Sequence, residues 1–195
     1  MGEPSRFKPM TVTLVGLGVL AAATALLPPS FRPWNFSAIG ALALFASARL
    51  GFWRGLVALA VALVVKETGV FLIHGFDPYP LSWVYFTMYA GFGYFFLRHT
   101  ESPLKIGGTT LAASLVFFVV SNFVSWLEQA YPYGYSLAGL MDCYAAGIPF
   151  YRATLFGDLI FSGAFFGLHY ALSRAYFPAE RVAEAEPVCE TEETW

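Results

Sequence analysis

Long apolar runs, separated by short polar segments, follow one another along most of the 195-residue chain. A helix that crosses a bilayer needs about 20 mainly apolar residues. The runs of about this length predict six membrane-spanning helices, at residues 10–28, 36–50, 55–74, 82–98, 106–127 and 149–176. The second run is short. The more polar stretch YSLAGLMDCYAAGIP, residues 135–149, is predicted to form a short helix at the membrane surface.

The first run has features of both a membrane helix and a signal peptide. Arg6 and Lys8 precede it, and AAATA near its end resembles a cleavage site. Its apolar stretch is longer than the about 7–15 residues of a signal-peptide core. We therefore predict that this helix is retained.

Composition agrees with a membrane protein, because 57% of the residues are hydrophobic and only 12% are charged. Soluble domains average about 25% charged residues. A soluble chain with so few charges would lack the polar side chains that cover a surface. We predict an all-α, polytopic membrane helix bundle with six transmembrane helices at residues 1–178, followed by an acidic, disordered cytoplasmic tail at 179–195.

The sequence contains no recognisable motif for binding a metal, a cofactor or a nucleotide. Cys143 and Cys189 have no neighbour at metal-ligand spacing, and the predicted topology puts them on opposite sides of the bilayer. The three histidines form no recognisable set with a nucleophile and an acid. We predict that the protein is not an enzyme, holds no metal or cofactor and binds no nucleic acid.

Ionisable side chains inside the predicted spans are the first candidates for function, because such groups are costly in a membrane and usually face the bundle interior. Lys66 and Asp158 lie at similar predicted depths in the outer half, with Asn122 somewhat shallower. Three interpretations remain open for Lys66 and Asp158: a structural ion pair, the floor of a substrate pocket, and a proton relay. The first two are compatible.

Polar and aromatic residues also gather in the predicted outer loops, above this level. Arg32 offers a planar guanidinium for a carboxylate or phosphate, and Trp34 offers a flat surface for stacking. Aromatic residues at an interface also occur without any ligand. The predicted ligand-facing residues are Arg32, Trp34, Asn35, Asn122, Asp142, Arg152 and Asp158.

Three segments resemble the DUF6580 family of bacterial integral membrane proteins: RPWNFSAIGALALFASARL, SNFVSW and LAGLMDCYAAGIPFYRATLFGDLIFSGAFFG. They cover most of residues 32–167. The chain departs from this family at KET, residues 66–68, where other members carry a Ser-Asp pair. The family in turn resembles the substrate-binding S components of energy-coupling-factor (ECF) vitamin transporters. That resemblance implies a ligand site near the outer face, and a coupling subunit with ATPases as partners, docked through Ala21 and Ala25.

The predicted function follows from these features together. We expect a protein of the bacterial inner membrane that binds a small molecule, vitamin-like or a modified base, from the outer face for uptake. The alternative is a structural or assembly membrane protein without a small-molecule ligand.

Loop charges predict the orientation, since cytoplasmic loops carry an excess of Lys and Arg. With the N-terminus inside, eight basic residues fall on the cytoplasmic side and two, Arg32 and Arg152, fall outside. The eight are Arg6, Lys8, Arg49, Arg54, Arg98, Lys105, Arg174 and Arg181.

Both termini should therefore be cytoplasmic. A reporter that is active only in the cytoplasm, fused at the C-terminus, is expected to be active. The same reporter inserted beside Tyr133 is expected to be silent. The reverse pattern would overturn both the topology and the predicted outer location of the site.

Overall fold

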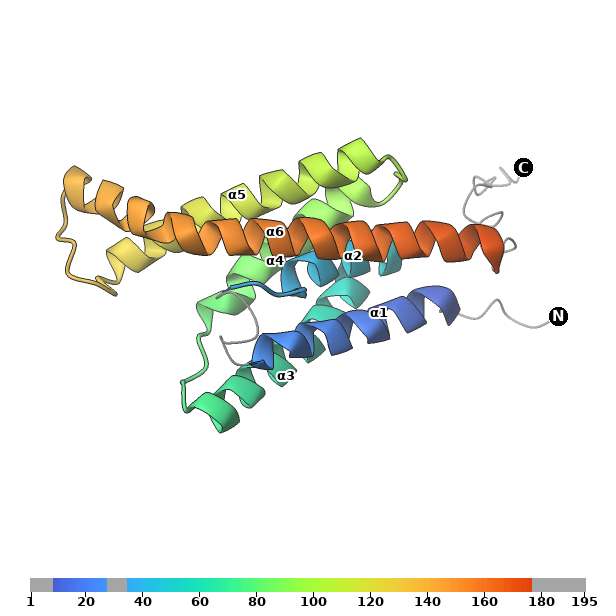
Figure 1. The fold of residues 1–195 in the computed structure, drawn as a ribbon, viewed down its shortest axis with the longest axis horizontal. Helices are drawn as coiled ribbons and strands as arrows, with labels where there is room; N and C mark the ends of the chain where they lie inside the picture. The colour runs from blue at the N-terminus through green and yellow to red at the C-terminus, as the bar shows by residue number, and fades with distance from the viewer. Residues whose placement is uncertain (1–8, 28–34, 177–195) are drawn as a thin grey trace, which may run out of the picture.

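The computed structural model describes residues 9–27 and 35–176, which form six α-helices, one 3-10 turn and no strand. The helices run back and forth along one bundle (Figure 1). Their bounds are Pro9–Ala22 for α1, Ile39–Leu50 for α2, Phe52–His74 for α3, Leu81–Leu97 for α4, Pro103–Leu127 for α5 and Leu137–Ala175 for α6. The 3-10 turn η1, Ala23–Leu26, extends α1.

The all-helical prediction is confirmed for these residues, and the starts and ends of most helices lie within a few residues of the predicted ones. Local signals explain several of these boundaries. Ser102 accepts a hydrogen bond from the Lys105 backbone N–H at the start of α5, and Ser136 accepts one from Gly139 at the start of α6. Gly75 ends α3 with a left-handed φ of 70°. The predicted tail, 179–195, lies outside the described residues.

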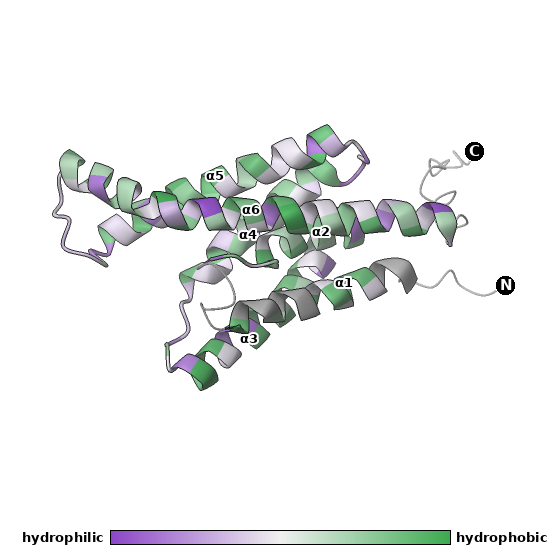
Figure 2. Ribbon diagram, viewed as in Figure 1, coloured by the Kyte–Doolittle hydropathy of each residue, from purple (hydrophilic) through white to green (hydrophobic). Residues whose placement is uncertain are grey.

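Three of the described helices, α3, α5 and α6, are long and apolar enough to cross a membrane. Figure 2 shows hydrophobic residues over much of the helix surfaces, with hydrophilic ones more frequent near loops and helix ends. Exposed apolar side chains run along α3, for example Val57, Val61 and Leu72. A face of this kind is stable against lipid and is costly in water. These helices are typical of a membrane protein.

The short helix α2 forms the core of the bundle. Every residue from Ile39 to Ala48 is buried, and the helix contacts each of the other five helices. At 12 residues it is about 18 Å long, less than the about 30 Å of a hydrocarbon core. An apolar helix with no exposed face is stabilised by the helices around it rather than by lipid or water.

Glycines bring four neighbouring helices close to α2 and to Ser37, two residues before it. A Cβ at Gly93 of α4 would overlap the Leu44 carbonyl oxygen, and one at Gly55 of α3 would overlap the Ser47 backbone. A Cβ at Gly18 of α1 would lie 2.5 Å from Leu42, and one at Gly157 of α6 would lie 3.2 Å from the Ser37 carbonyl oxygen. Small residues allow such close helix contacts in membrane bundles.

The helix α6 corrects one prediction. Residues 135–149 do not form a separate surface helix, because residues 137–175 form one continuous helix with Pro149 inside it. A proline normally breaks a helix. Here contacts with α5 hold the chain on both sides of it: the Tyr144 hydroxyl donates to the Val119 carbonyl at 2.9 Å, and the rings of Tyr151 and Phe118 lie 4.7 Å apart.

The two ends of the bundle differ. The start of α1, the end of α6 and the α4–α5 loop lie at one end, and the α3–α4 and α5–α6 loops lie at the other (Figure 1). At that second end, α5 and α6 extend beyond the remaining helices as a hairpin. With 39 residues, α6 is about 58 Å long, far more than one bilayer crossing requires.

Two glycines of α4 allow a matched test of the packing around α2. Gly93→Ala should destabilise the fold by about 1–3 kcal/mol, because the new methyl group overlaps a backbone oxygen. Gly91→Ala should be neutral or slightly stabilising, because no atom lies within 4 Å of its added Cβ and Ala favours a helix. Thermal unfolding in mild detergent measures both. Equal melting temperatures for the two variants would contradict the close contact between α2 and α4.

Candidate functional site

A buried carboxylate, Asp158, occupies the centre of the bundle. It lies midway along α6 and is only 2% exposed. Its Oδ2 atom accepts hydrogen bonds from the Tyr89 hydroxyl of α4, at 2.6 Å, and from the Ser114 hydroxyl of α5. Tyr89 and Ser114 are themselves almost fully buried. We call Asp158, Tyr89 and Ser114 the central polar cluster.

The first turn of α2 closes the remaining side of the central polar cluster. A Cβ at Gly40 would overlap Oδ1 of Asp158 and would lie 2.8 Å from the Tyr89 ring. Only a glycine therefore leaves room for this carboxylate against α2. The N-terminal end of a helix carries a partial positive charge, which favours a neighbouring acidic group. Four helices thus meet at a single acidic side chain.

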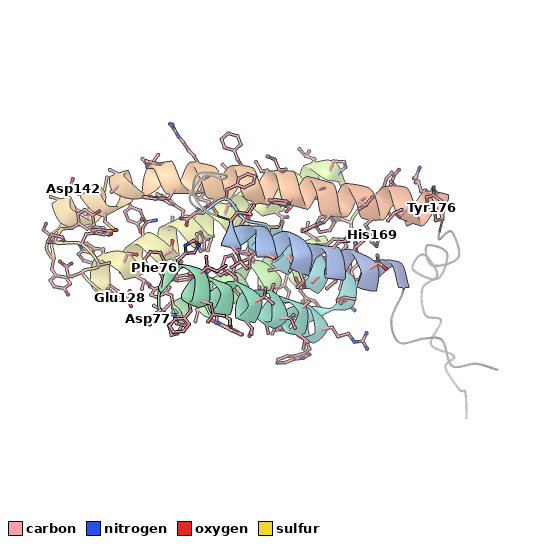
Figure 3. The ribbon with its side chains drawn as sticks, turned by 60° about the horizontal axis from the view of Figure 1, so that its bottom comes forward. Phe76, Asp77, Glu128, Asp142, His169 and Tyr176 are labelled. Atoms are coloured by element: carbon pink, nitrogen blue, oxygen red, sulfur yellow. The ribbon has the colours of Figure 1, made fainter. Side chains whose placement is uncertain are left out.

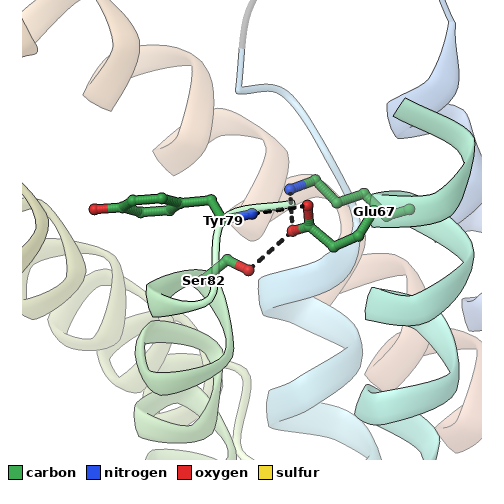
Figure 4. A network of polar contacts seen from close by, with 4 residues as sticks. Glu67, Tyr79 and Ser82 are labelled. Carbon is green, nitrogen blue, oxygen red and sulfur yellow. Dashed lines mark hydrogen bonds and ion pairs between the residues drawn. The ribbon is translucent and has the colours of Figure 1, made fainter. Parts of the chain in front are cut away.

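A second polar cluster surrounds Glu67 of α3 (Figure 4). Lys66 forms an ion pair with Glu67 at 2.8 Å, and the Ser82 hydroxyl donates to the same carboxylate at 2.9 Å. The Tyr79 backbone N–H donates to its other oxygen at 3.4 Å. Glu67 is 7% exposed, so these contacts satisfy a largely buried charge.

Tyr79 extends this second cluster toward the end of α5. Its hydroxyl donates to a Glu128 oxygen at 2.9 Å. Burial, then hydrogen bonding to Tyr85 and Glu128, raises the pKa of Tyr79 well above its usual value. The phenol therefore remains a donor to Glu128 at ordinary pH and ties the α3–α4 loop to the end of α5.

Lys66 and Asp158 consequently have partners other than those we predicted. Lys66 pairs with Glu67, whereas Asp158 accepts from two uncharged hydroxyls. The reason is architectural, because α2 contacts both α3 and α6 while those two helices make no contact with each other in the described chain. Similar depth along the bundle did not bring the two side chains together.

The other predicted ligand-facing residues do not converge on Asp158. Asp142 is exposed near the α5–α6 loop (Figure 3). Because α6 is continuous, its 16 residues from Asp142 to Asp158 correspond to about 24 Å along the axis. Arg152 and Asn35 are exposed, and Asn35 has a left-handed φ of 63°. Asn122 packs on Gly147, where a Cβ would overlap its amide oxygen.

Four further predicted residues are described in part or not at all. Arg32 and Trp34 lie outside the described residues. Ala21 lies in α1 and Ala25 in the 3-10 turn η1, so an uninterrupted α-helix does not join them. The i, i+4 alignment of the two alanines depends on such a helix.

Sequence reasoning missed Tyr89 and Ser114 of the central polar cluster, and Gly40, which packs against it. Each is a single polar or small residue within an apolar run, and such residues commonly serve only for packing. One signal was available: Thr110 and Ser114 on α5, and Asp158 and Ser162 on α6, are each four residues apart. All four side chains are buried, which is unusual for polar residues of apolar helices.

Fold and site together define a helical membrane protein with a buried acidic centre. A family model described as a family of unknown function, DUF6580, matches residues 5–183. The chain belongs to this family. No curated protein and no solved structure matches the chain.

The two clusters should behave as independent units. Tyr89→Phe should lower the free energy of unfolding by about 1–3 kcal/mol, since it removes a hydrogen bond to a buried acceptor. Its effect should shrink when Asp158 is already Asn. Lys66→Met and Asp158→Asn should be additive, because their contacts are not shared. Double-mutant cycles of thermal stability test this, and strong coupling between Lys66 and Asp158 would contradict the separate clusters.

Proposed function

We propose that this protein binds a small molecule within the membrane, entering from the outer side for uptake, with the central polar cluster as its recognition centre. The observation that supports the proposal is the burial of Asp158 among four helices, where its partners among the described residues are two uncharged hydroxyls. An ionisable residue is costly inside a membrane bundle, and it commonly marks a ligand or ion site there. A purely structural hydrogen bond would not require a carboxylate.

The approach to α2 supports the same proposal. Residues 35–37 are not helical, although they enter the bundle beside Gly157 of α6. Non-helical backbone at membrane depth is tolerated where it is buried in protein or lines a cavity. In many transporters, the ends of interrupted helices supply polar groups to a substrate. Here the start of α2 and the Asp158 carboxylate lie together, so hydrogen-bond donors and acceptors are available at one place.

We propose further that the protein crosses a bacterial inner membrane six times, with both termini in the cytoplasm. The start of α1 and the end of α6 lie at the same end of the bundle, in keeping with an even number of crossings. In this setting the protein acts as an S component does, alone or with an ECF coupling subunit and ATPases. Arg32 and Trp34 keep their predicted role in covering the ligand.

A structural or assembly role is the second candidate, and the α5–α6 hairpin favours it. The hairpin projects beyond the other helices and exposes aromatic side chains near its tip, including Tyr131 at 65% and Tyr135 at 71%. Aromatic residues are enriched at protein interfaces. An assembly protein would recognise its partner there and would not require the central polar cluster.

Native mass spectrometry of gently purified protein tests the first candidate. We expect the wild type to retain a small molecule that Asp158→Asn loses, because the amide replaces an acceptor oxygen by a donor group. Glu67→Gln is the matched control, as it alters the other buried carboxylate and should retain the same mass. Melting temperatures, measured on the same preparations, exclude unfolding as the cause of any loss. Retention by Asp158→Asn at the wild-type level would remove Asp158 from the site. A wild type that carries a protein partner and no small molecule would favour assembly.

A further inference from the structure

A groove of about 480 Å³ lies between the first half of α5 and the second half of α6. These two helices separate toward the α4–α5 loop (Figure 1). Ile106, Leu159 and Phe166 supply apolar walls. Gly107 and Gly163 also line the groove, and no atom lies within 4 Å of a Cβ placed on either of them. The volume falls within the about 300–1,000 Å³ of small-molecule sites.

Two buried hydroxyls distinguish this groove from an ordinary gap between helices. Thr110 of α5 is 0% exposed and Ser162 of α6 is 1% exposed, and both residues line the groove. Neither hydroxyl has a hydrogen-bond partner in the described part of the chain. Ser and Thr side chains within helices can donate back to a carbonyl of the preceding turn. Thr154 does so here, donating to the Phe150 carbonyl at 3.1 Å.

A buried hydroxyl without a partner costs free energy, and an acceptor within the groove would remove that cost. Both side chains can donate, one from each wall. Among the described residues that line the groove, Glu101 is the one with a charge, and it is exposed beside the α4–α5 loop. An anionic head group would therefore meet no cation from these residues, whereas a neutral carbonyl oxygen suits two hydroxyl donors between apolar walls.

We infer that this groove binds a lipid-soluble molecule with a neutral carbonyl head group, of the quinone type, whose oxygens accept hydrogen bonds from Thr110 and Ser162. Phe166 and Tyr170 line the groove and supply aromatic contacts for the ring of such a molecule. The inference does not rest on the proposed uptake function. Asp158 does not line the groove, although it lies one helical turn from Ser162.

Photolabelling in liposomes tests this inference on the full-length protein. The probe is an azido-substituted short-chain ubiquinone analogue, with decylubiquinone as competitor, and labelled peptides are identified by mass spectrometry. We expect labelling within α5 and α6 that decylubiquinone suppresses. Absence of competed labelling in these helices would overturn the inference.

Adjacent glycines of α5 provide a matched pair of variants. Gly107→Leu fills the groove and should lower the competed labelling at least about tenfold. Gly108→Leu makes the same change at the next position, which is exposed and does not line the groove, and it should label as the wild type does. Both added side chains begin in open space, so both variants should fold. Wild-type labelling of Gly107→Leu would overturn the groove as the site.

Hydroxyl variants test the head group. The double variant Thr110→Val with Ser162→Ala should lose at least about tenfold in competed labelling, since it removes two hydrogen bonds that are each worth up to about this factor. Thr110→Ser with Ser162→Thr keeps both hydroxyls and should restore it. Undiminished labelling of the Val/Ala variant would show that the groove takes any acyl chain, which overturns carbonyl recognition.

Discussion

The enclosure of α2 is the constraint on which the rest of this structure depends. A 12-residue helix with ten consecutive buried residues has no face left for lipid or water. It holds its place because its neighbours contact it through glycines, at Gly93 of α4 and Gly55 of α3 among others. Each contact leaves no room for a methyl group. Close-packed interiors of this kind tolerate little change in volume, so the positions of the surrounding helices are coupled through α2.

The acidic centre follows from that enclosure. Because α2 begins midway along α6, its first turn meets Asp158, and Gly40 leaves space for the carboxylate. Tyr89 and Ser114 reach the same oxygen from α4 and α5. Moving any one of these helices would leave a polar group buried without a partner, which costs about 1–3 kcal/mol. The helix that organises the packing also positions the most unusual side chain of the core.

Hydrophobic patterning was sufficient to predict the helical class and most helix boundaries, because apolar run length reflects local physics. The prediction was wrong for the polar stretch that ends in Pro149, which is part of α6 and not a separate surface helix. Contacts with Val119 and Phe118 of α5 hold this stretch in line with the rest of α6, and a single sequence does not display them. Pattern reasoning likewise placed Lys66 and Asp158 at similar depth. It could not show that α2 would lie between their helices, because depth carries no information about neighbours.

Of the residues that form the candidate site, the sequence pointed to Asp158 and did not point to Tyr89, Ser114 or Gly40. Loop residues such as Asp142 were assigned to the same pocket on the assumption that α6 began after them. The continuous helix carries Asp142 about 24 Å away instead. Nothing in the local sequence marked Tyr89 and Gly40 as site residues, because their role depends on their contacts with Asp158. Local sequence therefore identified the costly group, and tertiary packing determined what surrounds it.

The meeting of α2 with the middle of α6 is tested most directly by an engineered cross-link. A Cβ at position 40 would lie 3.1 Å from the Asp158 Cγ, so cysteine side chains at these two positions would be in contact. With Cys143 and Cys189 replaced by Ser and a protease site in the α4–α5 loop, Gly40→Cys/Asp158→Cys should cross-link under mild oxidation in membranes. The two halves should then stay joined after cleavage until a reductant is added. Gly40→Cys/Asp142→Cys, with Asp158→Ala to leave room at position 40, should not cross-link. Cross-linking from position 142 and not from 158 would contradict this arrangement of the core.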